Sequence, residues 1–222
     1  MTLDLSHTNL KSKQREIRNG FPEGLGLRVH RALSWLGRAE TLSDDNDAQF
    51  VFLWIAFNAA YAREDAFHEY AATERTVYTE FFSKLVSLDD EQRIYDAIWK
   101  KFSGPIRSLM SNRFIFSAFW HHFNGKPGFE DWERRFVTSS RAFTNAIQAQ
   151  DSAQVLSKLF ERLYVLRNQL IHGGSTWKSS ANREQVRDGA VILSFLVPVF
   201  IDIMMDHPGE NWGQPYYPVV EN

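Results

Sequence analysis

Three residues near the end of one predicted helix are of the types that handle phosphate chemistry: Arg167, Asn168 and His172. A neutral imidazole can accept a proton near physiological pH, and a guanidinium fork can hold negative charge that develops on a phosphate. The amide of Asn168 can orient either the imidazole or the phosphate. This set of side chains suits a reaction in which the 2′-hydroxyl of RNA attacks the adjacent phosphate.

Helical geometry decides which of these side chains meet. Asn168 and His172 are four residues apart and share a neighbouring face. Arg167 and His172 are five apart and differ by roughly 140° around the helix axis. Arg167 also follows Leu163 by four residues, so it lies on the apolar stripe, where a permanent charge is costly without a partner. A long arginine side chain can still converge with the histidine at the mouth of a groove.

The helix that carries these residues is predicted to run from about Asp151 to His172. Asp151 is a suitable N-cap, and Gly173-Gly174 suit the left-handed turn that closes a helix. Apolar residues recur between them at three- and four-residue spacing, which indicates an amphipathic helix: Val155, Leu156, Leu159, Phe160, Leu163, Leu166 and Leu170.

The spacing of arginine and histidine is not by itself informative, because it occurs a second time in Arg63-Glu64-Asp65-Ala66-Phe67-His68. That copy has acidic residues beside its arginine and no apolar run between the two residues. We interpret it as an exposed helix end. Only the copy at Arg167 and His172 lies within a core-forming helix.

We expect no metal and no cofactor. The chain has no cysteine, and no aspartate or glutamate stands between Glu161 and Glu184 to serve a hydrolytic metal site. His121 and His122 are adjacent and would point about 100° apart on a helix. Neither has an acidic residue at helical spacing to complete a ligand set.

The order Arg167-Asn168, three residues, then His172 resembles the R-N-x-x-x-H signature of the HEPN superfamily, the Apea-like group included. These are all-helical modules of prokaryotic defence and toxin systems and of many RNases. The segment from Phe52 to Tyr61 is similar to the second core helix of that superfamily. The resemblance covers the helices near 25–62 and 151–206.

The resemblance implies a metal-independent endoribonuclease of a defence or toxin-type system. It implies catalytic roles for His172, Arg167 and Asn168, RNA as substrate, and a homodimer in which two such clusters share one cleft. An antitoxin or sensor protein is a possible further partner. Two alternatives stay open: a non-catalytic HEPN module for binding or dimerisation, and a purely structural His172 that caps the last carbonyls of its helix.

The rest of the chain also has helical periodicity, and alternating strand patterns are absent. We therefore predict one all-α domain over residues 1–222. Its four-helix core comprises helices near 25–42, 46–62, 151–172 and 183–206, and a helical insertion spans about 73–148. Asn58 is the polar exception in the apolar second helix. It is either a buried amide bonded to backbone or a residue that supports the Arg167 cluster.

Composition narrows the class of protein further. A hydrophobic content of 44% is ample for a packed core. The net charge of −2 argues against a general nucleic-acid coat, because non-specific binding depends on lysine and arginine neutralising phosphates. No apolar run is long enough for a membrane span, and no signal-peptide pattern is present, so we expect a cytoplasmic protein without membrane contact. The polar stretch before Gly20, with Lys11, Lys13 and Arg15, is expected to be a solvated arm or a phosphate-binding one. The final helix is expected to cover both the core and a partner chain.

Overall fold

The computed structural model describes residues 4–62, 72–215 and 217–219, and the side chains of residues 72–77 lie outside this description. The elements of the described chain are all helices, with no β-strand among them, which confirms the prediction of an all-α fold. The second Arg-x4-His copy, at Arg63 and His68, lies outside the described residues.

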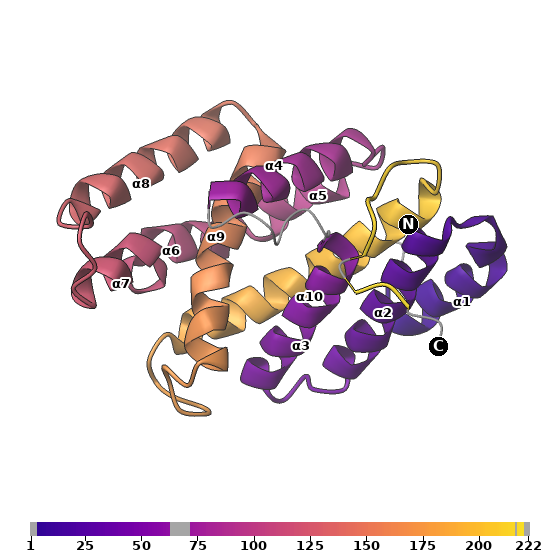
Figure 1. Cartoon of the computed structure of the whole chain (residues 1–222), viewed down its shortest axis with the longest axis horizontal. Coiled ribbons are helices and arrows are strands. Elements are labelled where there is room, and N and C mark those ends of the chain that lie inside the picture. The colour runs from indigo at the N-terminus through magenta and orange to yellow at the C-terminus, as the bar shows by residue number, and fades with distance from the viewer. Residues whose placement is uncertain (1–3, 63–71, 216, 220–222) are drawn as a thin grey trace.

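Four long helices occupy the ranges predicted for the core: α2 (Glu23–Glu40), α3 (Asn46–Tyr61), α9 (Ser152–Ile171) and α10 (Arg183–Asp206). In Figure 1, α2 and α3 lie side by side, and α10 runs behind them. The capping residues explain these boundaries. Asp45 accepts the backbone N–H groups of Asp47 and Ala48, both at 3.1 Å, and so starts α3.

The segment between α3 and α9 is a series of shorter helices. They are α4 (Ala72–Ser87), α5 (Arg93–Asp96), the π-helical η3 (Ala97–Lys101), α6 (Ser103–Ser111), the 3-10 turn η4 (Arg113–Ile115), α7 (Ser117–Phe123) and α8 (Trp132–Gln148). In Figure 1, α6, α7 and α8 form the end of the molecule opposite α1 and α2, and α9 passes between the two ends.

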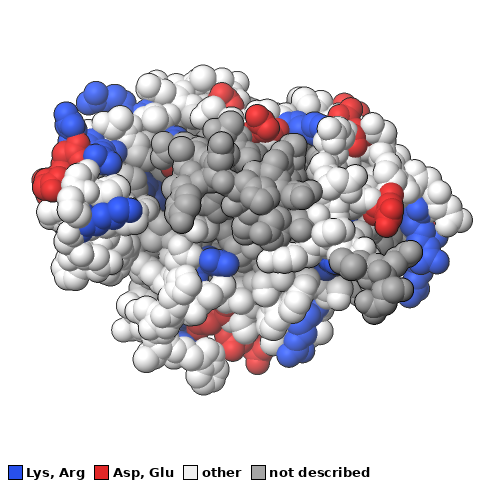
Figure 2. All heavy atoms as spheres, in the orientation of Figure 1, with Lys and Arg blue, Asp and Glu red and all other residues white. Residues whose placement is uncertain are grey.

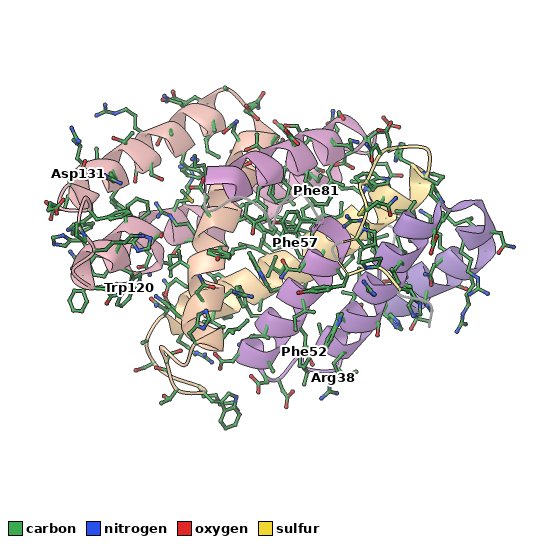
Figure 3. The ribbon with its side chains drawn as sticks, in the orientation of Figure 1. Arg38, Phe52, Phe57, Phe81, Trp120 and Asp131 are labelled. Carbon is green, nitrogen blue, oxygen red and sulfur yellow. The ribbon has the colours of Figure 1, made fainter. Side chains whose placement is uncertain are left out.

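This insertion is not separated from the core helices. α4 packs extensively along α9, and Tyr78, Phe82 and Leu85 of α4 belong to the same buried cluster as the residues of α2, α3 and α10. The centre of that cluster is aromatic. Phe57 lies 4.5 Å from Phe160 between ring centroids, and Phe82 lies 4.7 Å from Phe160. Figure 3 shows Phe57 and Phe81 at this centre, where α3 meets α4.

The N-terminal stretch is not the solvated arm that its polarity suggested. Residues His7–Ile17 form α1, followed by a 3-10 turn, η1 (Arg18–Gly20), and α1 packs on α2 and α10. Leu10 is buried, and Lys13 is paired with Asp202 at 2.6 Å and with Asp206 at 2.7 Å. Two carboxylates of α10 thus hold a lysine that the sequence alone indicated to be free.

The tail after α10 is non-helical, and Trp212 packs back on the body as expected. Its ring is 6% exposed, lies against Phe81 and donates from Nε1 to the carbonyl of His207 at 2.9 Å. Tyr216 lies outside the described residues.

Helix α10 is long and apolar enough for a membrane span, the one such helix in the described part of the chain, but 78% of its apolar window is buried inside the protein. Its neighbours are helices of the same chain, and Val191, at 45%, is the large apolar residue of α10 that stays exposed. The apolar width of α10 is therefore used within the chain, and it no longer argues for a partner.

Candidate functional site

Helix α9 positions the predicted cluster. The side chain of Asp151 caps its start by accepting the backbone N–H of Gln154 at 3.0 Å. At the other end, Gly173 has a φ of +69° and the N–H of Gly174 donates to the carbonyl of Gln169 at 2.8 Å. Glycine takes this left-handed conformation without strain, so the helix ends directly after the motif.

Arg167 is half-buried and has no carboxylate partner within the described part of the chain. Its Nη1 donates to the side-chain oxygen of Asn168 at 2.8 Å. Its Nε is fully buried and has no hydrogen-bond partner among the described residues. The guanidinium also lies 5.9 Å from the ring centre of Tyr164, one turn earlier on α9. A cation held in this way keeps part of its hydrogen-bonding capacity unused.

A pocket of about 470 Å³ opens beside Arg167. Aromatic rings and two arginines make up much of its wall, which includes Arg31, Trp35, Trp54, Asn58, Tyr164 and Arg167. Trp35 is stacked on Phe52 at 5.4 Å, which fixes the plane of its ring. Such a wall offers flat apolar surfaces together with positive charge, a combination suited to planar, negatively charged ligands.

The structure brings Asn58 to this same pocket, although Asn58 and Arg167 are more than 100 residues apart in sequence. Asn58 is half-buried and its amide makes no hydrogen bond with any described side chain or backbone group. Asn58 is therefore not a buried amide bonded to the backbone, which was the first of the two interpretations of this residue. Asn58, Arg167 and, through its hydrogen bond, Asn168 form one group.

His172 lies apart from this group. It is the C-terminal cap residue of α9, its ring is exposed, and it is not among the residues that line the pocket. Its backbone N–H donates to the carbonyl of Asn168 at 3.0 Å, while its ring has no hydrogen-bond partner in the described part of the chain. The imidazole is thus exposed to solvent, one helical turn beyond Asn168.

Gln169, next to Asn168 in the motif, ties the end of α9 to the insertion. Its Nε2 donates to the carbonyl of Phe114 in η4 at 2.7 Å, and its Oε1 accepts Asn182 Nδ2 at 2.9 Å. Asn112 in turn donates to Asn182 Oδ1 at 3.4 Å. This amide chain, formed by Gln169, Asn112 and Asn182, joins α9, the insertion and the start of α10.

The loop between α9 and α10 is fixed to the start of α3. Trp177 Nε1 donates to Asp45 at 2.9 Å, and the backbone N–H of Lys178 donates to Asp47 at 3.1 Å. Burial alone would raise the pKa of Asp45, but the hydrogen bonds from Ala48, Trp177 and Asp47 outweigh it and hold that pKa below 3.8. The loop that follows His172 is therefore anchored by two acidic residues.

Two arginines near the pocket were not among the predicted site residues. Arg31 lines the pocket and donates to the carbonyl of Tyr217 at 2.6 Å. Arg28 is fully buried and donates to the carbonyls of Ala60, Gln214 and Gly213 at 3.0, 2.8 and 3.2 Å. Arg28 lies on the apolar stripe of α2, three residues after Leu25. A charged residue on an apolar stripe is the same signal that singled out Arg167.

No group of three or more histidine, aspartate or glutamate side chains is placed for a metal ion within the described residues. His121 Nε2 instead lies 3.2 Å from the hydroxyl of Ser117, and His122 lies against Trp132.

Comparison with known proteins gives no relative from which a role can be transferred: no protein family, curated protein or solved structure matches this chain.

Proposed function

We propose that this protein is a metal-independent endoribonuclease that works in the cytoplasm as part of a prokaryotic defence or toxin-type system. The observation that carries the proposal is the state of Arg167. Among the described residues, this half-buried cation has no carboxylate partner and no acceptor for its Nε, and it is held by Asn168 one turn before an imidazole that makes no hydrogen bond there. The resemblance of Arg167-Asn168 and His172 to the HEPN signature supports the same reaction.

In the proposed reaction, neutral His172 takes the proton of a ribose 2′-hydroxyl, and the 2′-oxygen attacks the neighbouring phosphorus. Arg167 stabilises the charge that develops on the phosphate, and Asn168 keeps the guanidinium in place. The bond from phosphorus to the 5′-oxygen then breaks, and that oxygen takes up a proton. The products are a 2′,3′-cyclic phosphate and a 5′-hydroxyl end.

The experiment is an assay of the purified protein on mixed RNA in EDTA, with end-group analysis of the products. We expect His172→Ala to abolish cleavage, and His30→Ala, which removes another exposed histidine, to leave it unchanged. DNA, which lacks the 2′-hydroxyl, should resist. Cleavage that needs Mg²⁺, or cleavage of DNA at a comparable rate, would contradict the proposal.

A homodimer that brings two such clusters into one cleft belongs to this proposal. Its support is the resemblance, together with the lack of a counter-charge for Arg167 among the described residues. The apolar surface of α10 adds no support, because α10 is already covered by its own chain. Light scattering coupled to size exclusion at micromolar concentration should give twice the mass of the chain. A strictly monomeric mass would remove this part of the proposal and leave the reaction itself to be tested by the assay.

A non-catalytic binding module is the second candidate, and one observation favours it. His172 is not part of the pocket wall, whereas Asn58, Arg167 and several aromatic rings are. A ligand held there would not need the imidazole. RNA binding that survives His172→Ala, in a protein that shows no cleavage with or without metal, would decide for this alternative.

A further inference from the structure

The pocket beside Arg167 has positive charge in its wall and no acidic group to neutralise it. Its described lining includes two arginines, Arg31 of α2 and Arg167 of α9, but no aspartate or glutamate. Arg31 donates to the carbonyl of Tyr217 and Arg167 to the amide of Asn168, and neither arginine meets a carboxylate in the described structure. Arg167 Nη2 has no acceptor among the described residues and, unlike Nε, is not enclosed by the protein. A ligand in this pocket would therefore meet unused donors on a cation.

One wall of the same pocket is a flat indole ring. Trp35 lines the pocket and is 37% exposed. It is stacked on Phe52 of α3, with the ring centres 5.4 Å apart and the ring planes 19° from parallel. Arg38 lies 5.9 Å from the ring centre of Phe52, and Figure 3 shows these two residues beside each other. A partly exposed aromatic ring whose plane is already fixed is the kind of surface on which an unpaired base stacks.

Asn58 brings both kinds of hydrogen-bonding group to this pocket. Its side chain has one acceptor oxygen and an NH2 group with two donors, and neither is bonded to a described residue. Phosphate oxygens only accept hydrogen bonds, whereas the edge of a base presents a donor and an acceptor side by side, which an amide side chain can pair with. The free amide is therefore better matched to a base than to a phosphate.

The size and surroundings of the pocket favour one nucleotide over a long stretch of RNA backbone. Its volume of about 470 Å³ is within the range usual for pockets that hold small organic ligands. Figure 2 shows acidic side chains among the basic ones on the visible face, and the net charge of the chain is −2. Binding through phosphates alone depends on many lysine and arginine contacts. Recognition by this protein is therefore expected to be local.

We propose that this pocket holds one unpaired nucleotide of the RNA substrate, with its base against Trp35, the edge of the base on Asn58 and its phosphate at Arg167. The identity of the ligand as RNA rests on the proposed ribonuclease function. In that reaction the phosphate at Arg167 is the one that is cleaved, so the selected base lies next to the cleaved bond. Trp35 and Asn58 are then the residues that give the cleavage its sequence preference.

The first test is calorimetric titration of the whole protein with AMP, GMP, CMP and UMP, and with ribose 5-phosphate as the ligand without a base. We expect the preferred nucleotide to bind at least about tenfold more tightly than ribose 5-phosphate. Trp35→Leu should weaken nucleotide binding at least about fivefold and leave ribose 5-phosphate unchanged. Arg167→Met should weaken both. Arg107→Met, which removes the same charge from an exposed position on α6, should change neither.

The role of Asn58 has its own readout, which is discrimination among the four bases. Asn58→Leu removes the amide at similar size, and the four affinities should then lie within about twofold of one another. Four equal affinities in the wild type would overturn the proposal. So would a base preference that survives in Asn58→Leu, or ribose 5-phosphate binding as tightly as the nucleotides.

A last arm separates RNA from a free nucleotide and this inference from the proposed function. A short unstructured RNA, titrated into His172→Ala so that it stays intact, should bind more tightly than any mononucleotide and displace it; weaker binding of the RNA would overturn its assignment as the ligand. Nucleotide binding with the expected pattern, in a wild type that cleaves no RNA, would end the ribonuclease proposal and leave the pocket standing. RNA cleavage without base preference, unaltered by Trp35→Leu, would do the reverse.

Discussion

The guanidinium of Arg167 is hydrogen-bonded to its own neighbour in sequence, Asn168, at 2.8 Å. This contact uses one nitrogen of the guanidinium, Nη1, and the side-chain oxygen of Asn168. The rest of the guanidinium, Nε included, has no acceptor among the described residues. In the proposed reaction, the adjacent Arg-Asn pair is therefore a preset hydrogen-bond donor for an anion, with Asn168 in a positioning role and Arg167 in contact with the phosphate.

This relationship predicts unequal effects of substitution on RNA cleavage. Arg167→Ala should lower kcat/KM by roughly 10²–10³-fold, the loss typical of a missing oxyanion donor. Asn168→Ala should cost less, because the arginine remains, and Arg167→Lys should fall between the two because it keeps the charge and loses the fork. Steady-state kinetics, with near-UV circular dichroism as the folding control, give the ranking. A kcat/KM lower for Asn168→Ala than for Arg167→Ala would contradict this ranking.

Gly189 in α10 is predicted to be required for the approach of α10 to α3. A Cβ at this position would lie 2.7 Å from Phe50 Cε2 and 3.1 Å from Leu163 Cδ2. Gly189→Ala should therefore lower the free energy of unfolding by about 1–3 kcal/mol, despite the higher helix propensity of alanine. Gly104→Ala is the matched control in α6, because nothing lies within 4 Å of its added Cβ. Urea denaturation of both variants provides the measurement.

Arg28 is predicted to hold the C-terminal tail on the core. Arg28→Met leaves three buried or part-buried carbonyls without their donor, those of Ala60, Gly213 and Gln214. The expected loss is roughly 2–4 kcal/mol in the free energy of unfolding, with faster amide exchange around residues 211–215. Arg38→Met, on the exposed face of α2, should change stability by about 0.5 kcal/mol or less. Unchanged exchange in the tail would show that Arg28 is not its anchor.

Asp45 should make stability depend on pH. Its pKa is lower in the folded chain than the ordinary 3.8, so its charge stabilises the fold above that value. That contribution is lost as the pH falls through the depressed pKa of the folded state. Asp45→Asn keeps a cap for α3 and removes the charge, so it should be less stable than wild type at neutral pH. The difference in stability between wild type and Asp45→Asn should shrink in acid. Thermal unfolding of both proteins, measured from neutral pH to below pH 3.8, tests this.

Helix boundaries were predictable where a cap residue stands beside a periodic apolar pattern. Asp45, Asp151 and Gly173 each mark an end of α3 or α9 that the structure confirms. α1 was not predictable in this way. Its fixed position depends on Lys13 meeting Asp202, a contact between residues 189 positions apart, and its own sequence is polar. Local pattern carries no information about such a partner.

The candidate site was predictable in part for the same reason. A charge on an apolar stripe singled out Arg167, and the same criterion applies to Arg28 and to Arg162, which follows Leu159 by three residues and precedes Leu166 by four. What the pattern cannot supply is the partner. Arg28 meets backbone carbonyls of a tail about 185 residues away, Arg162 meets aromatic faces, and Arg167 meets its neighbour.

The amide chain through Gln169 fastens the last turn of α9 to the insertion and to the start of α10. Gln169 is held at both ends, by the carbonyl of Phe114 and by Asn182, and it is the residue between Asn168 and the turn that carries His172. The last turn of α9, which carries Asn168 and leads into His172, is thus fastened to a segment that contributes none of the predicted catalytic groups.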